Sequence, residues 1–499
     1  MKVRKLLAAV MAFSLCTAGL TALTGSAETT PLFGDIDGSG DIDATDASWI
    51  LRYAADVGSG IYDGTLEEYV RNAGRPQPKT ITDGGEKLTI ASWNDNDLKN
   101  MIEVFNQDYP DITVEYVNCG ANSGGAASEK YRSFLNSGEG VDMFIAESGW
   151  ILNYINDEGY SVPLSELGIT EDDYTNAYDY TVDIGTDNNG VLKAASWQAT
   201  PGGYCYNATL AEQYLGIKTP EEMQAKISDW DGFAAMAAEL SEATDGSVTV
   251  AASLDDMWQC YATSTNSPWL IDGKINTQTA REFTEMIVPY VQNNSIDVSV
   301  AQWGEYDWMV LGKEEGTLGY FFSTWCLTAG NQLEQICGAE GNWRLVQGPQ
   351  EYFWGGSWLC VSPNCDNKTE AARFIKYFTS DAETMEKYAL ASGDFVNNKT
   401  VMEKIAASDY SNPLLGGQNQ FAILKDAAVN IKLNETITEY DEDLKLSLRL
   451  ALHSQPMYSA IYDGNIDAVV ESFLEEAKNT IPELFPEEES TESTEQEAS

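Results

Sequence analysis

From Lys87 onward, short apolar runs alternate with segments of helical spacing, and this alternation restricts the fold more than any other feature of the chain. The runs expected to form strands are 88–93, 112–117 and 141–146. Helical segments are expected between them, at 98–105 and around 127–135. Strands that alternate with helices favour a mostly parallel sheet with helices on both faces.

Polar and aromatic side chains follow two of these predicted strands at their carboxyl ends. Trp93-Asn94-Asp95 follows the first strand, and Glu147-Ser148-Gly149-Trp150 follows the third. Ligands of open α/β sheets bind at this edge of the sheet. These two loops are therefore candidates for a binding site.

A third candidate is the run Trp197-Gln-Ala-Thr-Pro-Gly-Gly-Tyr-Cys-Tyr-Asn207. A strand-like segment reaches a Thr-Pro-Gly-Gly break, resumes, and then enters a helix-like segment at 208–215. Pro201 fixes φ, while Gly202 and Gly203 tolerate dihedrals that other residues cannot adopt. The local pattern alone is also consistent with an ordinary loop between a strand and a helix.

The order of motifs resembles that of extracellular solute-binding proteins of carbohydrate ABC transporters, over residues 86–485. In that family, the run at 197–207 would be the first crossing between two lobes. Gly316-Thr-Leu-Gly-Tyr-Phe-Phe-Ser-Thr-Trp325 resembles the second crossing and Glu351-Tyr-Phe-Trp-Gly-Gly-Ser-Trp358 the third. Residues 370–380 resemble the helix that returns to the second lobe.

The resemblance implies an α/β, periplasmic-binding-protein-like fold with two discontinuous lobes and a three-segment hinge. The first lobe would comprise 86–202 and 323–361, and the second 203–322 and 362–485. The chain would cross between them at Gly202-Gly203, Phe322-Ser323 and Val361-Ser362. A few residues at such crossings can absorb lobe closure.

The first 27 residues have the features of a secretory signal peptide. Three cations precede an apolar run, which ends in small residues up to Ala27. Lipidation at Cys16 is the alternative, but the bulky Leu15 precedes that cysteine. No later run approaches the roughly 20 apolar residues of a membrane span. We therefore expect a secreted protein, found in the medium or at the cell surface, with a disordered acidic tail at 486–499.

Residues 28–74 contain a calcium-loop pattern. Oxygen ligands are expected from Asp35, Asp37, Ser39, the carbonyl of Asp41, Asp43 and Asp46. The Asp at the last position, with a helix-like segment after it, resembles a dockerin type I repeat, which implies bound calcium and a cohesin-like partner. A second repeat is not visible in the sequence, and a solvated acidic loop is the alternative. Residues 75–85 are expected to be a Pro-containing linker.

Charge and cysteine content restrict the partners. The chain has 78 acidic and 29 basic residues, a formal charge of −49, so nucleic acid and anionic membranes would be repelled. A neutral or cationic ligand fits better. Seven cysteines follow the signal peptide without metal-site spacing. Buried free thiols are expected, with a Cys360–Cys365 bridge as the alternative.

Aromatic residues next to acids or amides suit carbohydrate, because sugar rings stack on aromatic faces while their hydroxyl groups need polar partners. Core packing is the competing explanation for any single tryptophan. The sugar-binding candidates are Trp93, Asn94, Asp95, Glu147, Trp150, Trp197, Gln198, Trp258, Trp325, Trp354 and Gly356. Trp325 is the aromatic expected to stack on the sugar.

We therefore expect a carbohydrate-binding protein, with an oligosaccharide as its ligand, that closes two lobes and delivers the sugar to the permease subunits of an ABC importer. No enzymatic activity is expected. A secreted glycoside hydrolase with a dockerin-like module is the alternative, and it would need two carboxylates such as Glu147 and Asp95 across a glycosidic bond. A non-transport scaffold component is a third possibility.

Overall fold

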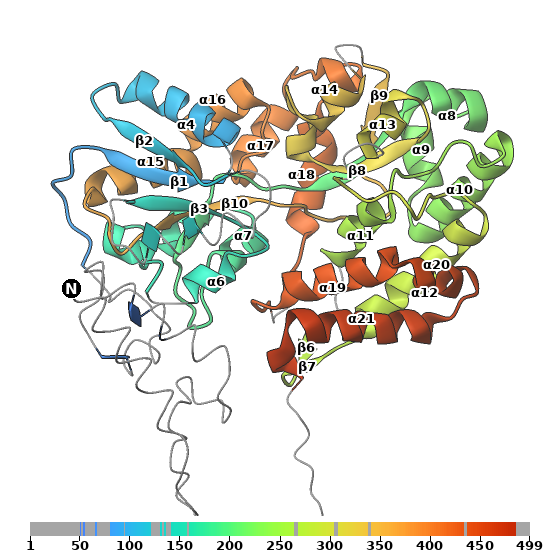
Figure 1. The fold of residues 1–499 in the computed structure, drawn as a ribbon. Helices are drawn as coiled ribbons and strands as arrows, with labels where there is room; N and C mark the ends of the chain where they lie inside the picture. Colours follow the sequence, from blue (N-terminus) through green and yellow to red (C-terminus); the bar gives the residue numbers. More distant parts are fainter. Residues whose placement is uncertain are drawn as a thin grey trace, which may run out of the picture.

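The computed structural model describes two lobes that lie side by side, with chain segments running between them (Figure 1). It describes residues 80–485 except 94, 121–129, 132–133, 136–140, 157–158, 264–267, 304–307, 338–340 and 434–436, and upstream only residues 50, 53–54 and 65–66. The predicted signal peptide, the six proposed calcium ligands and the acidic tail lie outside the described residues.

The first lobe contains a five-stranded mixed sheet in the order β2-β1-β3-β10-β4. Its strands are β1 (Leu88–Ser92), β2 (Val114–Asn118), β3 (Met143–Glu147), β4 (Ala194–Ser196) and β10 (Ser357–Val361). β1 pairs in parallel with β2 and β3, whereas β10 is antiparallel to both β3 and β4. Every residue of β1 is buried, as expected for a strand covered on both faces. The three predicted strands and their parallel pairing are therefore confirmed.

Helices that are far apart in sequence cover this sheet. They are α4 (Asp95–Asp108), α6 (Leu152–Ile155), α7 (Asp179–Ile184), α15 (Lys368–Thr379) and α16 (Ala382–Ser392). The ring of Phe105 in α4 lies 5.1 Å from Phe374 and 5.3 Å from Tyr377, both in α15.

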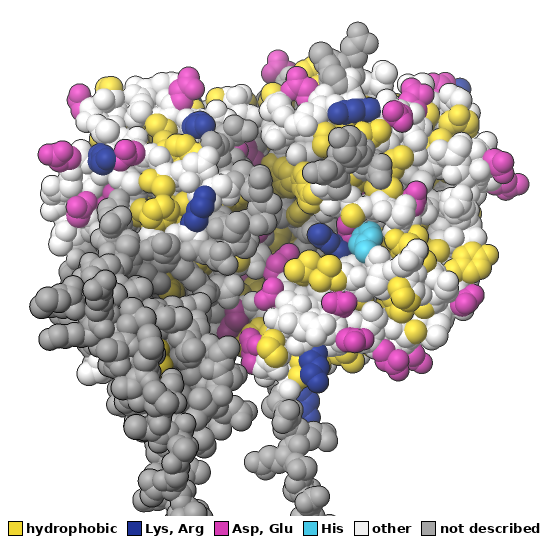
Figure 2. Space-filling view, viewed as in Figure 1, with side chains coloured by type: hydrophobic (Ala, Val, Ile, Leu, Met, Phe, Trp, Pro, Cys, Tyr) yellow, Lys and Arg dark blue, Asp and Glu magenta, His cyan; other side chains and the backbone are white. Residues whose placement is uncertain are grey.

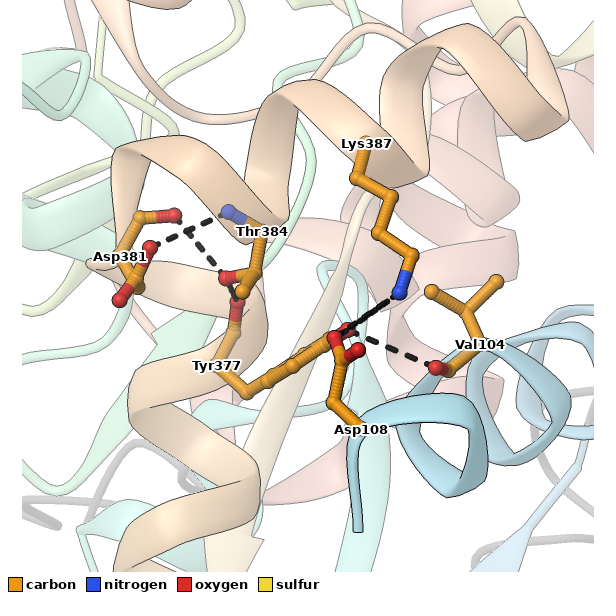
Figure 3. A network of polar contacts seen from close by, with 6 residues as sticks. All are labelled: Val104, Asp108, Tyr377, Asp381, Thr384 and Lys387. Carbon is orange, nitrogen blue, oxygen red and sulfur yellow. Dashed lines mark hydrogen bonds and ion pairs between the residues drawn. The ribbon is translucent and has the colours of Figure 1, made fainter.

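Polar contacts join α4, α15 and α16 (Figure 3). The Tyr377 hydroxyl donates to Asp108 at 2.6 Å, and Lys387 of α16 pairs with the same carboxylate at 2.8 Å. The prediction that the helix at 370–380 returns to the second lobe was wrong. Its apolar face is buried against α4 of the first lobe.

The second lobe contains a three-stranded antiparallel sheet in the order β8-β5-β9. Its strands are β5 (Gly202–Asn207), β8 (Gly319–Ser323) and β9 (Trp343–Val346). The central strand β5 is buried throughout. Thr249 and Thr317 form an isolated bridge outside the named strands of this lobe.

Most of the second lobe is helical (Figure 1). Its helices are α8 (Ala208–Leu215), α9 (Pro220–Lys226), α10 (Trp230–Thr244), α11 (Leu254–Ala262), α12 (Gln278–Gln292), α13 (Trp308–Lys313), α14 (Gln332–Cys337), α18 (Gln420–Asn430), α19 (Asp441–His453), α20 (Gln455–Tyr462) and α21 (Ile466–Thr480). A short hairpin of β6 (Leu270–Ile271) and β7 (Lys274–Ile275) extends it, and α17 (Lys399–Ala406) contacts both α16 and α18.

The chain passes from β4 of the first sheet to β5 of the second through residues 197–201, next to the predicted Gly202-Gly203. The other two predicted crossings were misplaced. From β8 the chain continues through α14 to β9 in the same sheet, so it returns to the first lobe only at 347–356. Because α15 and α16 pack on the first lobe, the last passage lies between α16 and α18. Residues 323–346 thus belong to the second lobe and 368–392 to the first.

Two further properties concern only the described residues. No disulfide joins any two of their seven cysteines, six of which are buried, so the Cys360–Cys365 bridge is not formed. None of their helices combines the length and the apolar character needed to cross a membrane.

Candidate binding cleft

A cleft lies between the lobes where the crossing at 347–356 meets the carboxyl end of β3. Its two overlapping parts have volumes of about 120 and 390 Å³. The first lobe contributes 147–150, 152–153 and Ile184, and the crossing contributes 353–355. The second lobe contributes residues of α11 and α19, together with 432–433 and 437–439. Figure 2 shows the furrow between the lobes, with acidic side chains along it.

Glu147, the last residue of β3, stands at the centre of the first-lobe wall. Its carboxylate accepts a hydrogen bond from the Ser148 hydroxyl at 2.9 Å and another from the Gly149 N–H at 3.1 Å. The parallel pairing of β1 and β3 brings this strand end to the ligand-binding edge of the sheet, as the strand pattern predicts.

A second carboxylate, Glu442, faces Glu147 from the first turn of α19. A Cβ added to Gly149 would lie 3.1 Å from the Glu442 Cδ and 3.2 Å from the Glu147 Oε2. The two carboxyl groups therefore approach each other across Gly149, which leaves no room for a side chain. Burial, the largest cause, and the charge of Glu442 together raise the pKa of Glu147 to about 7, while the hydrogen bonds from Ser148 and Gly149 and the charge of Lys445 act in the opposite direction.

Behind the second-lobe wall, α11 and α19 are joined by Asp255, which is buried. Its carboxylate accepts from the Gln302 N–H at 2.8 Å, contacts the His453 Nε2 at 2.8 Å and lies 3.7 Å from the Arg449 Nε. Asp255, Gln302 and Arg449 all line the cleft. The contacts of Asp255 with His453 and Arg449 fix the position of α19 relative to α11, and thereby the position of Glu442.

Three tryptophans form a cluster at the crossing. The Trp325 Nε1 donates to the Trp354 carbonyl at 2.9 Å, and the two rings meet edge to face with centroids 4.8 Å apart. Trp303 lies nearly parallel to Trp325, at an interplanar angle of 15° and a centroid distance of 6.2 Å. Trp354 lines the cleft, so the cluster reaches the binding space.

Four of the predicted site residues line the cleft: Glu147, Trp150, Trp258 and Trp354. Asn94 lies outside the described residues, and Asp95 begins α4. Trp325 contacts the rings of Trp303 and Trp354 but is not part of the cleft lining. Gly355 lines the cleft, whereas the predicted Gly356 does not.

Among the described residues, the cleft lining does not include Trp93, Trp197 or Gln198. Trp197 is 1% exposed and belongs to the core, and Gln198 is buried with its Nε2 donating to Asp394 at 2.9 Å. Trp93 packs against the core of the first lobe. For Trp197 and Gln198 the structure therefore favours packing, the competing explanation.

Several cleft residues carry no local sequence signal. Glu442 and Lys445 lie in an amphipathic helix whose sequence does not differ from that of other surface helices. Asp255 and Gln259 lie in α11 with the predicted Trp258, but no motif marks them. Trp303 has φ of 65° and lies upstream of α13, and no local pattern marks it as a site residue. Trp303 was therefore missed as an exposed aromatic.

Two α/β lobes that exchange chain segments and enclose a polar and aromatic cleft define a two-lobed, periplasmic-binding-protein-like binding protein. A sequence model of the bacterial extracellular solute-binding proteins matches residues 100–413. The chain belongs to this family. A comparison with curated proteins finds no match.

Solved structures agree with the fold. A crystal structure of an extracellular solute-binding protein of family 1 has a TM-score of 0.68 at 18% identity, covering 79% of this chain and 100% of that one. The ABC-transporter-associated binding protein of B. animalis subsp. lactis, solved with β-1,6-galactobiose, gives 0.62 at 17% identity over 80% and 98% of the two chains. The galacto-N-biose/lacto-N-biose I-binding protein of Bifidobacterium longum, solved with lacto-N-biose, gives 0.61 at 16% over 81% and 99%.

Proposed function

We propose that this protein binds a carbohydrate outside the cell and delivers it to the permease subunits of an ABC importer. The observation that carries the proposal is the composition of the interlobe cleft. Carboxylates from both lobes and an amide, Gln259, line the cleft together with Trp150 and Trp354. Aromatic faces accept the apolar faces of sugar rings, and the carboxylates and the amide accept or donate hydrogen bonds at their hydroxyl groups.

The cleft supports an oligosaccharide as the ligand. It extends from Trp269 and Thr263 past Gln259 to Asp255 and Arg449. A single sugar ring would leave much of this wall in contact with water. The similar proteins solved with β-1,6-galactobiose and lacto-N-biose are consistent with a disaccharide or longer ligand.

Binding acts through closure and needs no covalent step. The two carboxylates at Gly149 come from different lobes, so they meet only when the lobes approach. A ligand that contacts Glu147 on one side and α19 on the other would favour the closed form, because it gains contacts there that the open form lacks.

A thermal-shift screen with maltose, β-1,6-galactobiose and lacto-N-biose, followed by calorimetry, tests the proposal. A ligand at 100 times its Kd adds about 2.7 kcal/mol to the free energy of unfolding, which a thermal shift detects. The absence of any response to these and to longer oligosaccharides would contradict carbohydrate binding.

The facing carboxyl groups of Glu147 and Glu442 also favour one alternative, the glycoside hydrolase. An acid with a raised pKa opposite a second carboxylate is the pair that such enzymes use. Incubation with labelled oligosaccharides separates the two functions. A binding protein returns the sugar intact, whereas an enzyme releases shorter products.

We also propose that the loop from Asp35 to Asp46 binds calcium. The support is the spacing of its oxygen ligands in the sequence, with Gly40 at the position of the sharp turn. A cohesin-like partner for residues 28–74 belongs to the same proposal. Calcium binding by the intact chain, measured by calorimetry after chelation, tests it.

A further inference from the structure

The first passage between the lobes changes its pairing partner at Thr200. Before Thr200, Gln198 forms a bridge with Val396 of the last passage. After Thr200, Pro201 forms a bridge with Phe353 of the crossing that returns to the first lobe. Thr200 itself lies between these two pairings and is 1% exposed. The three chain segments are therefore not independent linkers, because they are joined on either side of one buried residue.

The pairing before Thr200 is fixed to the first lobe. Asn397, in the last passage, donates through its Nδ2 to the Ser196 carbonyl of β4 at 3.1 Å. Its Oδ1 accepts from the N–H of Tyr178, the residue that precedes α7, at 3.0 Å. The residues before Thr200 therefore move with the first sheet.

The pairing after Thr200 is fixed to the second lobe. The Tyr352 hydroxyl lies within hydrogen-bond distance of the Gly203 carbonyl in β5, at 3.2 Å, and of the Phe322 carbonyl in β8, at 3.0 Å. A Cβ at Gly202 would overlap the Tyr352 ring, so only glycine fits at that position of the Thr-Pro-Gly-Gly break. The residues after Thr200 therefore move with the second sheet.

Thr200 itself bonds to both lobes and to the cleft wall. Its N–H donates to the hydroxyl of Tyr180 in α7 at 2.9 Å, and its carbonyl accepts from the hydroxyl of Ser323 in β8 at 3.1 Å. Its own hydroxyl donates to the Gly355 carbonyl at 3.1 Å. Since Gly355 lines the cleft, this last bond connects the point where the chain changes lobes to the binding space.

Gly355 is the corresponding bending point of the crossing. On one side of it, Tyr352 is held by the second sheet. On the other side, the Gly356 carbonyl accepts from the Ser148 N–H of the first lobe at 3.1 Å. Gly355 and Gly356 have φ of 76° and 103°, where glycine can change its dihedrals and other residues cannot follow. Rotation between the lobes is therefore taken up between Tyr352 and Gly356, beside Thr200.

We infer that Thr200 is a positioning residue for ligand binding. Closure bends the chain at Thr200 and at Gly355, and the hydrogen bond from the Thr200 hydroxyl couples the two bends in the closed form. Because Gly356 also holds the loop of Ser148, the movement reaches the first-lobe wall of the cleft directly. The inference rests on the proposed function, since it describes how that binding site is assembled.

The test compares Thr200→Val, Thr200→Ser and Thr284→Val with the wild-type protein. Thr200→Val removes the hydroxyl and keeps a branched side chain, whereas Thr200→Ser keeps the hydroxyl. Thr284→Val is the matched control, because the Thr284 hydroxyl is also buried and donates to a carbonyl, that of Ala280 in α12, at 2.6 Å. Each protein is measured by calorimetry against maltose, β-1,6-galactobiose and lacto-N-biose, by small-angle scattering without sugar, and by thermal unfolding.

For any of these sugars that the wild type binds, Thr200→Val should weaken affinity about three- to tenfold, the effect of one hydrogen bond lost from the closed form. It should also increase the radius of gyration of the unliganded protein, because fewer molecules are closed. Thr200→Ser should restore both values, and Thr284→Val should keep both whatever its melting temperature. A lower melting temperature in Thr200→Val with wild-type affinity and radius would overturn the inference, because Thr200 would then only stabilise the fold.

A second variant tests the bend without depending on the Thr200 side chain. In Gly355→Ala the new Cβ has room, 3.4 Å from the Trp325 Nε1, but alanine is strained at φ of 76°, so the unliganded protein should be more open. An unchanged radius of gyration in both Gly355→Ala and Thr200→Val would refute the pivot. If the wild type binds none of the sugars, the proposed function fails, and these ligand-free curves still decide whether the lobes pivot at Thr200.

Discussion

Ligand affinity should depend on pH through Glu147. Burial and the facing Glu442 raise the pKa of this carboxyl from 4.5 to about 7. In the open form the lobes separate, Glu442 moves away, and the pKa of Glu147 returns toward its ordinary value. Closure therefore takes up a proton at pH values between 4.5 and about 7, and rising pH through this window favours the open form.

The full shift corresponds to about 3 kcal/mol, which is an upper limit for the effect on closure. The hydrogen bonds from Ser148 and Gly149, which lower the pKa of Glu147, lie within the first lobe and can persist in either form. If about half of the shift is lost on opening, affinity for a neutral sugar should fall about tenfold between pH 5.5 and 8. Below pH 4.5 and above about 7, the dependence on this group should level off.

Calorimetry at four pH values, with small-angle scattering at the same values, measures both affinity and closure. Glu147→Gln should remove the slope, because an amide does not titrate. Glu439→Gln, a second acid of the cleft lining, serves as the matched control and should keep the slope. A wild-type affinity that is flat with pH would refute the reasoning. An affinity that rises with pH would refute it too, and would indicate a ligand that brings a positive charge to Glu147.

Three further predictions test other parts of the molecule. Gly149→Val should hinder closure, because even a Cβ would lie 3.0 Å from the Glu442 Cγ. It should lower sugar affinity about tenfold and increase the ligand-bound radius of gyration, without lowering the melting temperature. Trp325→Ala should lower the free energy of unfolding in urea by about 3 kcal/mol, because its ring packs between Trp303 and Trp354; unchanged stability with lost affinity would instead restore the sequence-based assignment. Asp35→Ala should abolish calcium binding measured by calorimetry and leave sugar affinity unchanged; retained calcium affinity would argue against the loop.

The strand and helix pattern was sufficient to predict the three parallel strands of the first lobe and one wall of the cleft. Glu147 and Trp150 follow a buried parallel strand, and the end of such a strand has a fixed position relative to the ligand edge of its sheet. The crossing at 197–201 was also visible, because the Thr-Pro-Gly-Gly break interrupts two strands of different sheets. These features depend on residues that are close in sequence.

The opposite wall depends on how distant segments pack, which local patterns do not encode. α19 reaches the cleft because it packs on α21 and α11, and nothing in the sequence of its first turn distinguishes Glu442 from other helix-capping acids. The return of α15 to the first lobe follows from the fit of its aromatic face to Phe105. Motif order alone placed that helix on the wrong lobe.

The candidate site and another buried pair of acids contain the same residue types, but only the site lines the cleft. Asp97 has a pKa raised to about 7 by burial and by the neighbouring Asp394, much as Glu147 has beside Glu442. Asp394 also holds Gln198, which was predicted to bind sugar. Yet, of the residues described, neither Asp97 nor Asp394 lines the cleft. Asp97 lies in α4 of the first lobe, and Asp394 lies in the last passage between the lobes, after α16. Opening the lobes would part Glu147 from Glu442, because they approach each other across Gly149 from the two lobes. A raised pKa thus indicates burial beside a like charge in both places, and only the pair divided between the lobes can couple that charge to ligand binding.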